Sequence, residues 1–552
     1  MSNSGVNELD SEFGLTRPMK ITTTPPNQED TGLTENIEES VIEHGANDDQ
    51  LLNDVEISLW FEDYIPENFV NQLEMVDNIT IAKNLETANT YLLLNEDCIE
   101  NAEWTYALVA AFPTWQDGVS FSELQSLWED GRETEDGFSS ILVENTEYQL
   151  FKTLWGEPSN EIVQIMEGEV LLETSWGTKG SVAIIPFENL DPRWKVLSVD
   201  GISPTDQDFD NEQYALNMDF CLASSLDEEY VLRSIFLPEK NRDPEKFTSV
   251  VMTGVTALVR ATANKMEINS FTYPGEKIYK WMTDADLTHV SNEVAFAESC
   301  PYPNPYQTDM RFCSDPQYIE LFTYLDIDIV ELTGNHIQDW SRRDFLQTMQ
   351  IYDENGIAYY AGGKDIYEAK APLLIELNGN KLAFIGCNAV GPTGAFATTT
   401  SSGNADCDDY QWLIDEVRRL VDEGYLPIVT LQHNEFYSMM KTGPQIRDFN
   451  PISKAGAVIV SGSQAHYPNP FAFEEGRFIH YGLGNLFFDQ MDAYVANGVQ
   501  REFIDRHIFY DGRYINTTVY TAYLEDFAQP RPMTASERRT FLEEAFIASG
   551  WK

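Results

Sequence analysis

The chain has 552 residues, which is enough for two to four domains at roughly 100–200 residues each. Hydrophobic residues make up 42% of the sequence and aromatic residues 12%, so it can bury substantial cores. The formal net charge of −56 and the pI near 4.2 argue against nucleic acid and an anionic membrane surface as partners. Acidic residues are spread along the whole chain, and no cluster of Lys and Arg marks a basic pocket.

No segment of the sequence is expected to span a membrane, because there is no run of about 18 apolar residues. The N-terminal stretch MSNSGVNELDSEFG lacks the basic and apolar regions of a signal peptide. We therefore expect either a cytoplasmic protein or one whose native leader is absent from this start site.

The first predicted segment, residues 1–54, is an acidic disordered arm. It carries twelve Asp and Glu residues against Arg17 and Lys20, and it has no periodic apolar face. High net charge and low apolar content leave such a segment little to bury. We expect the arm to be dispensable for folding.

Residues 55–243 are predicted to form an α/β domain, because short β-rich runs alternate with helical stretches. One helix is expected to begin at Ser120, where Glu123 completes a capping box ahead of Leu124 and Leu127. The β-rich runs are Val55–Trp60, Tyr106–Phe112, Val182–Pro186 and Trp194–Val199.

A second alternating series is predicted from residue 244 to residue 527. Helices are expected at Arg342–Glu354 and Tyr410–Glu423. Residues 528–552 are expected to form a C-terminal helix, which begins at a capping box on Thr534 and packs back on the body. The strand candidates of this series are Ser249–Thr253, Leu287–Val290, Ile327–Thr333, Lys381–Gly386, Pro427–Leu431, Ala457–Ser461 and Phe478–Gly482.

Four of the six cysteines are placed to close two loops. Cys300 and Cys313 bracket the Pro-rich stretch CPYPNPYQTDMRFC, and Cys387 and Cys407 bracket a stretch rich in Gly, Ser and Thr. These loops are candidates for disulfide bonds if the protein matures outside the cytoplasm, and buried free thiols are the alternative. Because the sequence has no CxxC, it does not predict a zinc ribbon or a thioredoxin-like site.

Three histidines follow strand candidates of the second series: His336, His433 and His466. Loops at the carboxyl ends of a mostly parallel sheet are where α/β proteins place ligand sites, so we expect these histidines to gather with Glu293 and Asp339. In two-metal phosphoesterases, a strand that ends in Gly-Asn-His, as in ELTGNHIQDW, puts an amide oxygen on a metal and an imidazole beside the scissile phosphate. The alternative is a chance tripeptide whose histidine is a hydrogen-bonded core residue.

Five motifs follow one another in the second series: MTGVTALVR, SNEVAF, ELTGNHIQDW, LQHNEFY and VSGSQAHYPNPFAFEEGRFIHYGLGNLFFDQ. Over residues 244–527 they resemble, in order, the CapA family of capsule-synthesis proteins, also called poly-γ-glutamate synthesis proteins. The family counterparts are Gly-Asp-x-Met-Leu, Asn-Leu-Glu, Asn-Asn-His-x-x-Asp, His-Trp-Gly, and Gly-x-His-Pro-His with the Ser-Leu-Gly-Asn-Phe-x-Phe-Asp segment after it. The resemblance implies the α/β sandwich fold of calcineurin-like metallophosphoesterases.

The first domain resembles a different class of protein. FPTWQDGVSFSELQSLWEDG and IIPFENLDPRWKVLSVDGISP are similar to periplasmic solute-binding proteins of the two-lobed α/β type. This resemblance implies a domain that binds a solute, and the alternative is an α/β domain without a ligand.

The chain departs from the CapA pattern at three ligand positions. Val255 stands where the family has its first Asp, and a valine cannot ligate a metal. Gln432 falls in the His-Trp-Gly slot, with His433 one residue away, and Gln464 replaces the first His of the last block. A neutral glutamine oxygen is a poor ligand for transition metals beside imidazole or carboxylate. We therefore expect at most one weakly bound divalent ion of the Mn or Zn class instead of a bridged pair.

The resemblance also implies roles for the family residues that remain. His336 would act as general acid or oxyanion stabiliser, together with Asp339. The residues that would hold an ion are Glu293, Asn335, and His433 or His466.

The sequence leaves three functions open. The first is a role in production, export or anchoring of a capsule or poly-γ-glutamate-type polymer at the cell surface, with a degraded metallophosphoesterase site. The second is a non-catalytic protein that binds a small solute or an anionic polymer. The third is an active metal-dependent phosphoesterase, and the three ligand substitutions favour binding over this catalysis.

Overall fold

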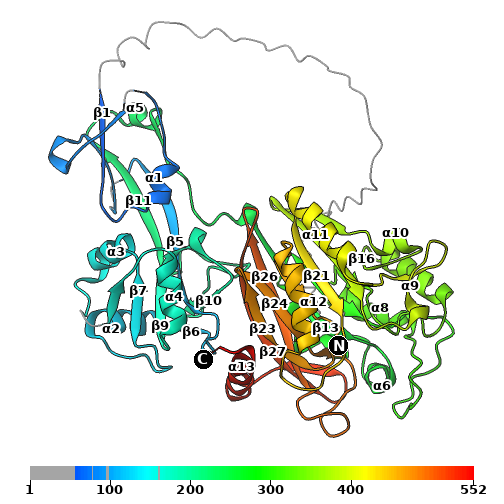
Figure 1. Ribbon diagram of the computed structural model, residues 1–552. Helices are drawn as coiled ribbons and strands as arrows, with labels where there is room; N and C mark the ends of the chain where they lie inside the picture. The colour runs from blue at the N-terminus through cyan, green and yellow to red at the C-terminus, as the bar shows by residue number, and fades with distance from the viewer. Residues whose placement is uncertain (1–55, 78, 95–97, 160–161, 552) are drawn as a thin grey trace, which may run out of the picture.

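The computed structural model describes residues 56–77, 79–94, 98–159 and 162–551, so the predicted arm and Val55 lie outside the described residues. The described chain forms two α/β parts that lie next to each other (Figure 1). We call residues 56–243 the N-terminal part and residues 244–551 the C-terminal part. The predicted α/β fold class is confirmed in both parts, while the domain boundaries stay predictions.

One mixed sheet organises the N-terminal part. Its long central strand β5 (Glu100–Ala111) pairs with β11 (Asn217–Ser224) along its first half and with β9 (Ser181–Pro186) along its second half. The sheet therefore has two lobes that share β5, which is the two-lobed form that the sequence predicts. Its other strands are β1 (Ile57–Phe61), β3 (Ile79–Ile81), β4 (Thr90–Leu93), β6 (Gly118–Val119), β7 (Ser140–Val143), β8 (Val163–Ile165) and β10 (Trp194–Val199). The helices are α1 (Glu67–Asn71), α2 (Phe121–Asp130), α3 (Asn145–Trp155), α4 (Glu169–Gly177) and α5 (Glu228–Leu232).

The C-terminal part is a sandwich of two sheets with helices on both outer faces. The first sheet runs in the order β16 (Ala358–Tyr360), β15 (Ile329–Glu331), β14 (Leu287–Asn292), β13 (Phe247–Thr256), β26 (Arg501–Tyr510), β27 (Arg513–Glu525) and β28 (Gln529–Pro532), with β25 (Asn485–Phe487) also on β13. The second sheet runs β18 (Leu373–Leu377), β19 (Asn380–Asn388), β21 (Leu426–Gln432), β22 (Ile459–Ser461), β24 (Arg477–Leu483) and β23 (Pro468–Glu474). The helices are α6 (Arg260–Ile268), α7 (Tyr279–Thr283), α8 (Ile319–Tyr324), α9 (Arg342–Glu354), α10 (Ile366–Ala369), α11 (Gln411–Asp422), α12 (Gly443–Lys454) and α13 (Ala535–Ser549).

Alternation along the strands builds three apolar layers in this sandwich. Met252 in β13 and Ile428 in β21 face the shared interior between the sheets. Their neighbours Val251 and Val429 point outward, Val251 to the layer of α6, α8 and α9 and Val429 to the layer of α11 and α12. Because both faces of these strands are buried, their sequences read as nearly continuous apolar runs.

Local sequence signals predicted most of these elements correctly. α2 begins at the Ser120 capping box and α13 at the Thr534 capping box. α9 has its predicted bounds, and all strand candidates of the second series correspond to strands. The antiparallel strands β26, β27 and β28, which complete the first sheet, were not among the candidates.

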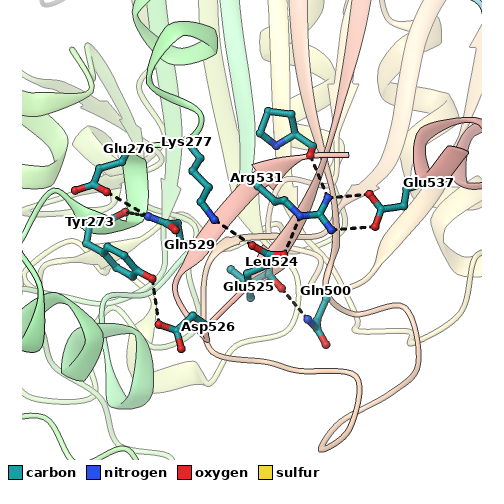
Figure 2. A network of polar contacts seen from close by, with 11 residues as sticks. Tyr273, Glu276, Lys277, Gln500, Leu524, Glu525, Asp526, Gln529, Arg531 and Glu537 are labelled. Atoms are coloured by element: carbon teal, nitrogen blue, oxygen red, sulfur yellow. Dashed lines mark hydrogen bonds and ion pairs between the residues drawn. The ribbon is translucent and has the colours of Figure 1, made fainter. Parts of the chain in front are cut away.

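Charged side chains tie the last strand and the last helix to the body (Figure 2). Arg531 of β28 forms ion pairs with Glu537 of α13 at 2.8 Å and with Glu525 of β27 at 2.9 Å. Glu525 in turn lies 3.0 Å from the ammonium nitrogen of Lys277. The sheet thus continues past residue 527, and α13 packs against β23.

A buried phenylalanine of the N-terminal part packs in the core of the C-terminal part. Phe112, the residue after β5, is only 4% exposed and belongs to the apolar core of the C-terminal part. Its ring lies 5.2 Å from that of Phe473, 5.6 Å from Phe478 and 5.7 Å from Trp551. Through this residue the N-terminal sheet is anchored in the C-terminal sandwich.

Both predicted loop closures are present as disulfide bonds, Cys300–Cys313 and Cys387–Cys407. A third bond, Cys98–Cys221, was not predicted; it joins the segment before β5 to β11. The alternative of buried free thiols is therefore wrong for this structure. In the described ranges, no helix is both long and apolar enough to cross a membrane.

Candidate functional site at the strand ends

The predicted site residues lie at the carboxyl ends of parallel strands in both sheets. Glu293 follows β14, and Asn335 and His336 follow β15 in the first sheet. Gln432 ends β21, and His466 follows β22 in the second sheet. The two sheets therefore bring these loops to one edge of the sandwich, as parallel strands do.

A glycine allows the loops after β14 and β15 to approach closely. A Cβ atom on Gly334 would lie 2.6 Å from Cα and 2.9 Å from the backbone oxygen of Glu293. Any other residue at this position would separate the two backbones. Asn404 holds the same loop by donating from its side-chain nitrogen to the backbone oxygens of Thr333 at 3.1 Å and Gly334 at 2.9 Å.

His466 lies between two carboxylates at the centre of the site. Its Nε2 is 3.7 Å from Oε1 of Glu293 and 3.6 Å from Oε1 of Glu435. The other ring nitrogen, Nδ1, is 2.8 Å from Oδ1 of Asn485, and the ring stacks on Phe488 at 5.0 Å. The contacts with Asn485 and Phe488 fix the orientation of the imidazole, so that Nε2 faces the two glutamates.

His336 is held by Asp339, three residues further along the chain. Nδ1 of His336 is 2.6 Å from Oδ2 of Asp339, and the His336 ring lies 4.8 Å from that of Phe312. Burial by itself lowers the pKa of His336, but the hydrogen bond with Asp339 and the negative charges of Glu293 and Glu435 outweigh burial and raise that pKa. This arrangement suits a group that carries a proton toward an anionic ligand.

A hollow of about 340 Å³ opens beside these residues and is lined by Asn335, Gln432, His433 and Glu435 together with Val390 to Pro392. His433 reaches this hollow, but its Nε2 lies 3.0 Å from Oδ2 of Asp448 in α12. The structure thus places His433 on a different partner from His466, while Glu435 contacts both the hollow and His466.

Several buried polar atoms at the strand ends have no hydrogen-bond partner among the described residues. They include Oε1 of Glu293, Oδ1 of Asn335, and both side-chain amide atoms of Gln432 and Gln464. Gln432 and Gln464 are fully buried, and neither amide finds a partner among the described protein groups. A buried polar atom left without any partner costs about 1–3 kcal/mol, so a ligand or water that hydrogen-bonds to these amides would be stabilised there.

Val255 offers no donor atom to the site. It is fully buried in β13, where it pairs with Ser291 of β14 and with Asn485 of β25. Residue 255 therefore lies at the centre of the strand-end region, but its apolar side chain can only pack there and cannot bind a ligand through a polar atom.

Sequence reasoning missed two residues of the site, Glu435 and Asn485. Both stand inside quoted motifs, LQHNEFY and GLGNLFFDQ, but neither was singled out. Only their distances to His466 reveal their part in the site.

Comparison with known proteins finds a family match over the part of the chain that holds the site. A family model described as bacterial capsule synthesis protein PGA_cap matches residues 249–490. This region is therefore similar to bacterial capsule synthesis proteins. The matched range includes every predicted site residue, from Val255 to His466.

Relatives with curated names are distant. The chain is 22% identical over 262 residues to "Capsule biosynthesis protein CapA" of Bacillus anthracis, a match that covers 46% of this chain and 62% of the relative. It is also 22% identical over 185 residues to "PGA biosynthesis protein CapA" of Bacillus subtilis (strain 168), covering 33% of this chain and 48% of that protein. The chain therefore spans roughly half to two thirds of the lengths of these relatives. Among solved structures, an ABC-type phosphate transport receptor from Vibrio cholerae is similar with a TM-score of 0.23 and 12% identity, over 26% of this chain and 71% of that one.

The donor atoms at the strand ends do not fit the bridged metal pair that the resemblance implies. In the described part of the chain, no group of three or more His, Cys, Asp and Glu side chains is placed to hold a metal ion. The unpartnered donors are one carboxylate oxygen, Nδ1 of His433 and several neutral amide atoms, and Val255 supplies none. Neutral oxygens are weak ligands for transition metals, so the site as built favours hydrogen bonding.

Proposed function

We propose that this protein acts in the production, export or anchoring of a capsule-type polymer through a binding site at the strand ends. The single observation that carries the proposal is the pair of buried, unpartnered amides of Gln432, which lines the hollow, and Gln464, two residues before His466. Each amide offers a donor and an acceptor, so it complements the amide groups of a γ-glutamyl chain better than it complements a metal ion. The family of residues 249–490 supports the polymer class.

A metal-dependent phosphoesterase is the second candidate. It is favoured by the His336–Asp339 pair and by the closeness of Glu293 to His466. In this candidate, one divalent ion of the Mn or Zn class would be held by Glu293, Asn335 and His466. His433 could contribute Nδ1, which has no partner among the described residues, while its Nε2 is held by Asp448.

Binding of a short γ-glutamyl oligomer, measured by calorimetry, tests the first candidate. We expect the double variant Gln432→Leu, Gln464→Leu to weaken binding at least tenfold, because it removes two hydrogen-bonding amides. The same variant is expected to be at least as stable as the unaltered protein, since it removes unpaired buried polar atoms. Gln317→Leu is the matched control, because Gln317 is exposed and lies outside the site. Unchanged binding in the double variant, or a large loss of its stability, would contradict the proposal.

Titration with Mn²⁺ and Zn²⁺ separates the two candidates. We expect the unaltered protein to bind no stoichiometric metal pair. Combining Val255→Asp with Gln464→His should raise metal affinity, whereas Gln317→His, which adds an imidazole at the surface, should not. Two tightly bound ions in the unaltered protein would favour the phosphoesterase and remove the main support for the binding site.

We also propose that the protein works at the cell surface or outside the cell. All six cysteines are paired in disulfide bonds, and disulfides persist in oxidising compartments. The location can be checked by extracting the native protein in the presence of a thiol-alkylating reagent and counting the alkylated cysteines. Six free thiols in the native material would place it in a reducing compartment.

A further inference from the structure

A cavity of about 330 Å³ lies at the junction of the two parts, away from the strand ends. The N-terminal part contributes β10 and the loop 200–206 to its wall, and the C-terminal part contributes β27 and α13. None of the residues that line this cavity belongs to the strand-end site. The volume is in the range of small-molecule sites.

Three cationic side chains meet in the lining of this junction cavity: Lys195, Arg506 and Arg538. They come from β10, β26 and α13, which explains why no Lys/Arg cluster is visible in the sequence. In a chain with a net charge of −56, such a gathering of positive charge is unusual. Long-range repulsion of anions by the protein makes a local basic pocket the place where an anion can bind.

Two of these cations share one carboxylate. Asp117 lies 2.7 Å from Nζ of Lys195, and it accepts from Nη2 and Nε of Arg538 at 2.7 and 2.8 Å. Burial lowers the pKa of Lys195 to about 8, so this ammonium is still mostly protonated at pH 7. The three charges of this group therefore leave one positive charge uncompensated.

Arg506 is the cation with the fewest partners. It is 4% exposed, and its Nη1 donates to the backbone oxygen of Thr205 at 2.6 Å. Its Nη2 is buried without a hydrogen-bond partner among the described residues. The contact with Thr205 therefore engages only Nη1 of Arg506 in the structure of the protein. Asp206 also lines the cavity without pairing with Arg506, and with Asp117 it offsets two of the three positive charges, so the lining as a whole carries one net positive charge.

The rest of the lining is apolar and aromatic. The rings of Trp281 and Tyr520 stack at 4.8 Å with an interplanar angle of 5°, and both line the cavity. Phe112, Leu542 and Phe546 line it as well. A ligand that fits this wall has an apolar or flat body.

We propose that the junction cavity binds a small ligand that carries a single carboxylate on an aromatic or aliphatic body. The free nitrogen of Arg506 and the ammonium of Lys195 match a carboxylate, because each can donate a charge-assisted hydrogen bond to one of its oxygens. One net positive charge in the lining matches one negative charge on the ligand. Since the walls come from both parts, such a ligand couples the N-terminal part to the C-terminal part.

Calorimetric titration of the full chain with benzoate tests this site, with benzamide as the neutral probe of the same shape. We expect saturable binding of one benzoate and at least tenfold weaker binding of benzamide. Arg506→Gln should weaken benzoate binding about tenfold or more and leave benzamide unchanged, as loss of a charge-assisted hydrogen bond does. Arg418→Gln is the control, because it removes the same charge from an exposed position on α11.

A second variant keeps the test decisive if Arg506→Gln does not fold. Thr518 lines the cavity from β27 and is half-buried, so Thr518→Trp should fill the cavity and abolish benzoate binding while every charge remains. Absence of saturable benzoate binding to the unaltered protein would overturn the proposal. Equal affinities for benzoate and benzamide, or equal losses in Arg506→Gln and Arg418→Gln, would also overturn it.

Discussion

Replacing Phe112 by alanine is expected to separate the two parts of the molecule. The side chain is 4% exposed and leaves the N-terminal sheet to enter the core of the C-terminal sandwich. Its ring contacts those of Phe473, Phe478 and Trp551, and it also lies 5.8 Å from the ring of Phe471. Removing a phenyl ring that is buried among aromatic rings loses its transfer free energy and leaves a cavity, for a total of about 3–5 kcal/mol.

The expected loss is in the free energy of unfolding of the C-terminal part, because the cavity forms in its core. Urea unfolding followed by tryptophan fluorescence reports on this core, since Trp551 adjoins the site of the change. We expect the first unfolding midpoint to fall and the chain between the parts to become sensitive to protease. Phe236→Ala is the matched control, because Phe236 is 50% exposed and its loss should change stability by less than about 0.5 kcal/mol. If the free energy of unfolding of the Phe112→Ala variant lies within about 1 kcal/mol of that of the unaltered protein, the anchoring role of this ring is refuted.

Two further predictions concern the C-terminal part. The double variant Cys387→Ala, Cys407→Ala opens a loop with a sequence separation of 20 residues. Because the unfolded chain regains the freedom of that loop, we expect a loss of about 3 kcal/mol in urea unfolding, and equal stability of both forms would contradict this. Burial raises the pKa of Asp328 from 3.8 to about 7. Because the folded protein holds this proton more tightly than the unfolded chain, the carboxyl costs no stability at a pH below its pKa in the unfolded chain. The free energy of unfolding then falls as the pH rises from that pKa to the pKa in the folded protein. Asp328→Asn, which stays neutral, should therefore gain about 3 kcal/mol relative to the unaltered protein between pH 5 and pH 8. Parallel stability curves for the two proteins would show that this carboxyl does not titrate as expected.

Elements with strong local signals could be predicted from the sequence. The capping boxes at Ser120 and Thr534 fixed the starts of α2 and α13, because a hydroxyl and a glutamate three residues later satisfy the first free backbone groups of a helix. Buried parallel strands such as β13 and β21 were recognisable as apolar runs. The order of the motifs then placed Glu293, Asn335 and His466 at strand ends.

Features that depend on long-range pairing could not be predicted in the same way. β26 pairs with β13 across most of the length of the C-terminal part, from Phe247 with Tyr510 to Thr253 with Ile504, and polar residues such as Asp505 and His507 interrupt its apolar pattern. Glu435 belongs to the site only because the fold brings it to His466. The junction cavity combines cations from distant positions, which a scan for local Lys/Arg clusters does not detect.

Contacts between protein groups hold the loops of the strand-end site in place. His466 is oriented by Asn485, and the loop after β15 is held against Glu293 by the close approach at Gly334. Beneath this loop, the fully buried carboxylate of Glu331 accepts hydrogen bonds from Thr333 and from Ser463, which precedes Gln464. These contacts join the loops of the two sheets through the protein itself. The loops therefore keep their positions without a side-chain donor at residue 255, and the protein alone holds the polar groups around His466 in place.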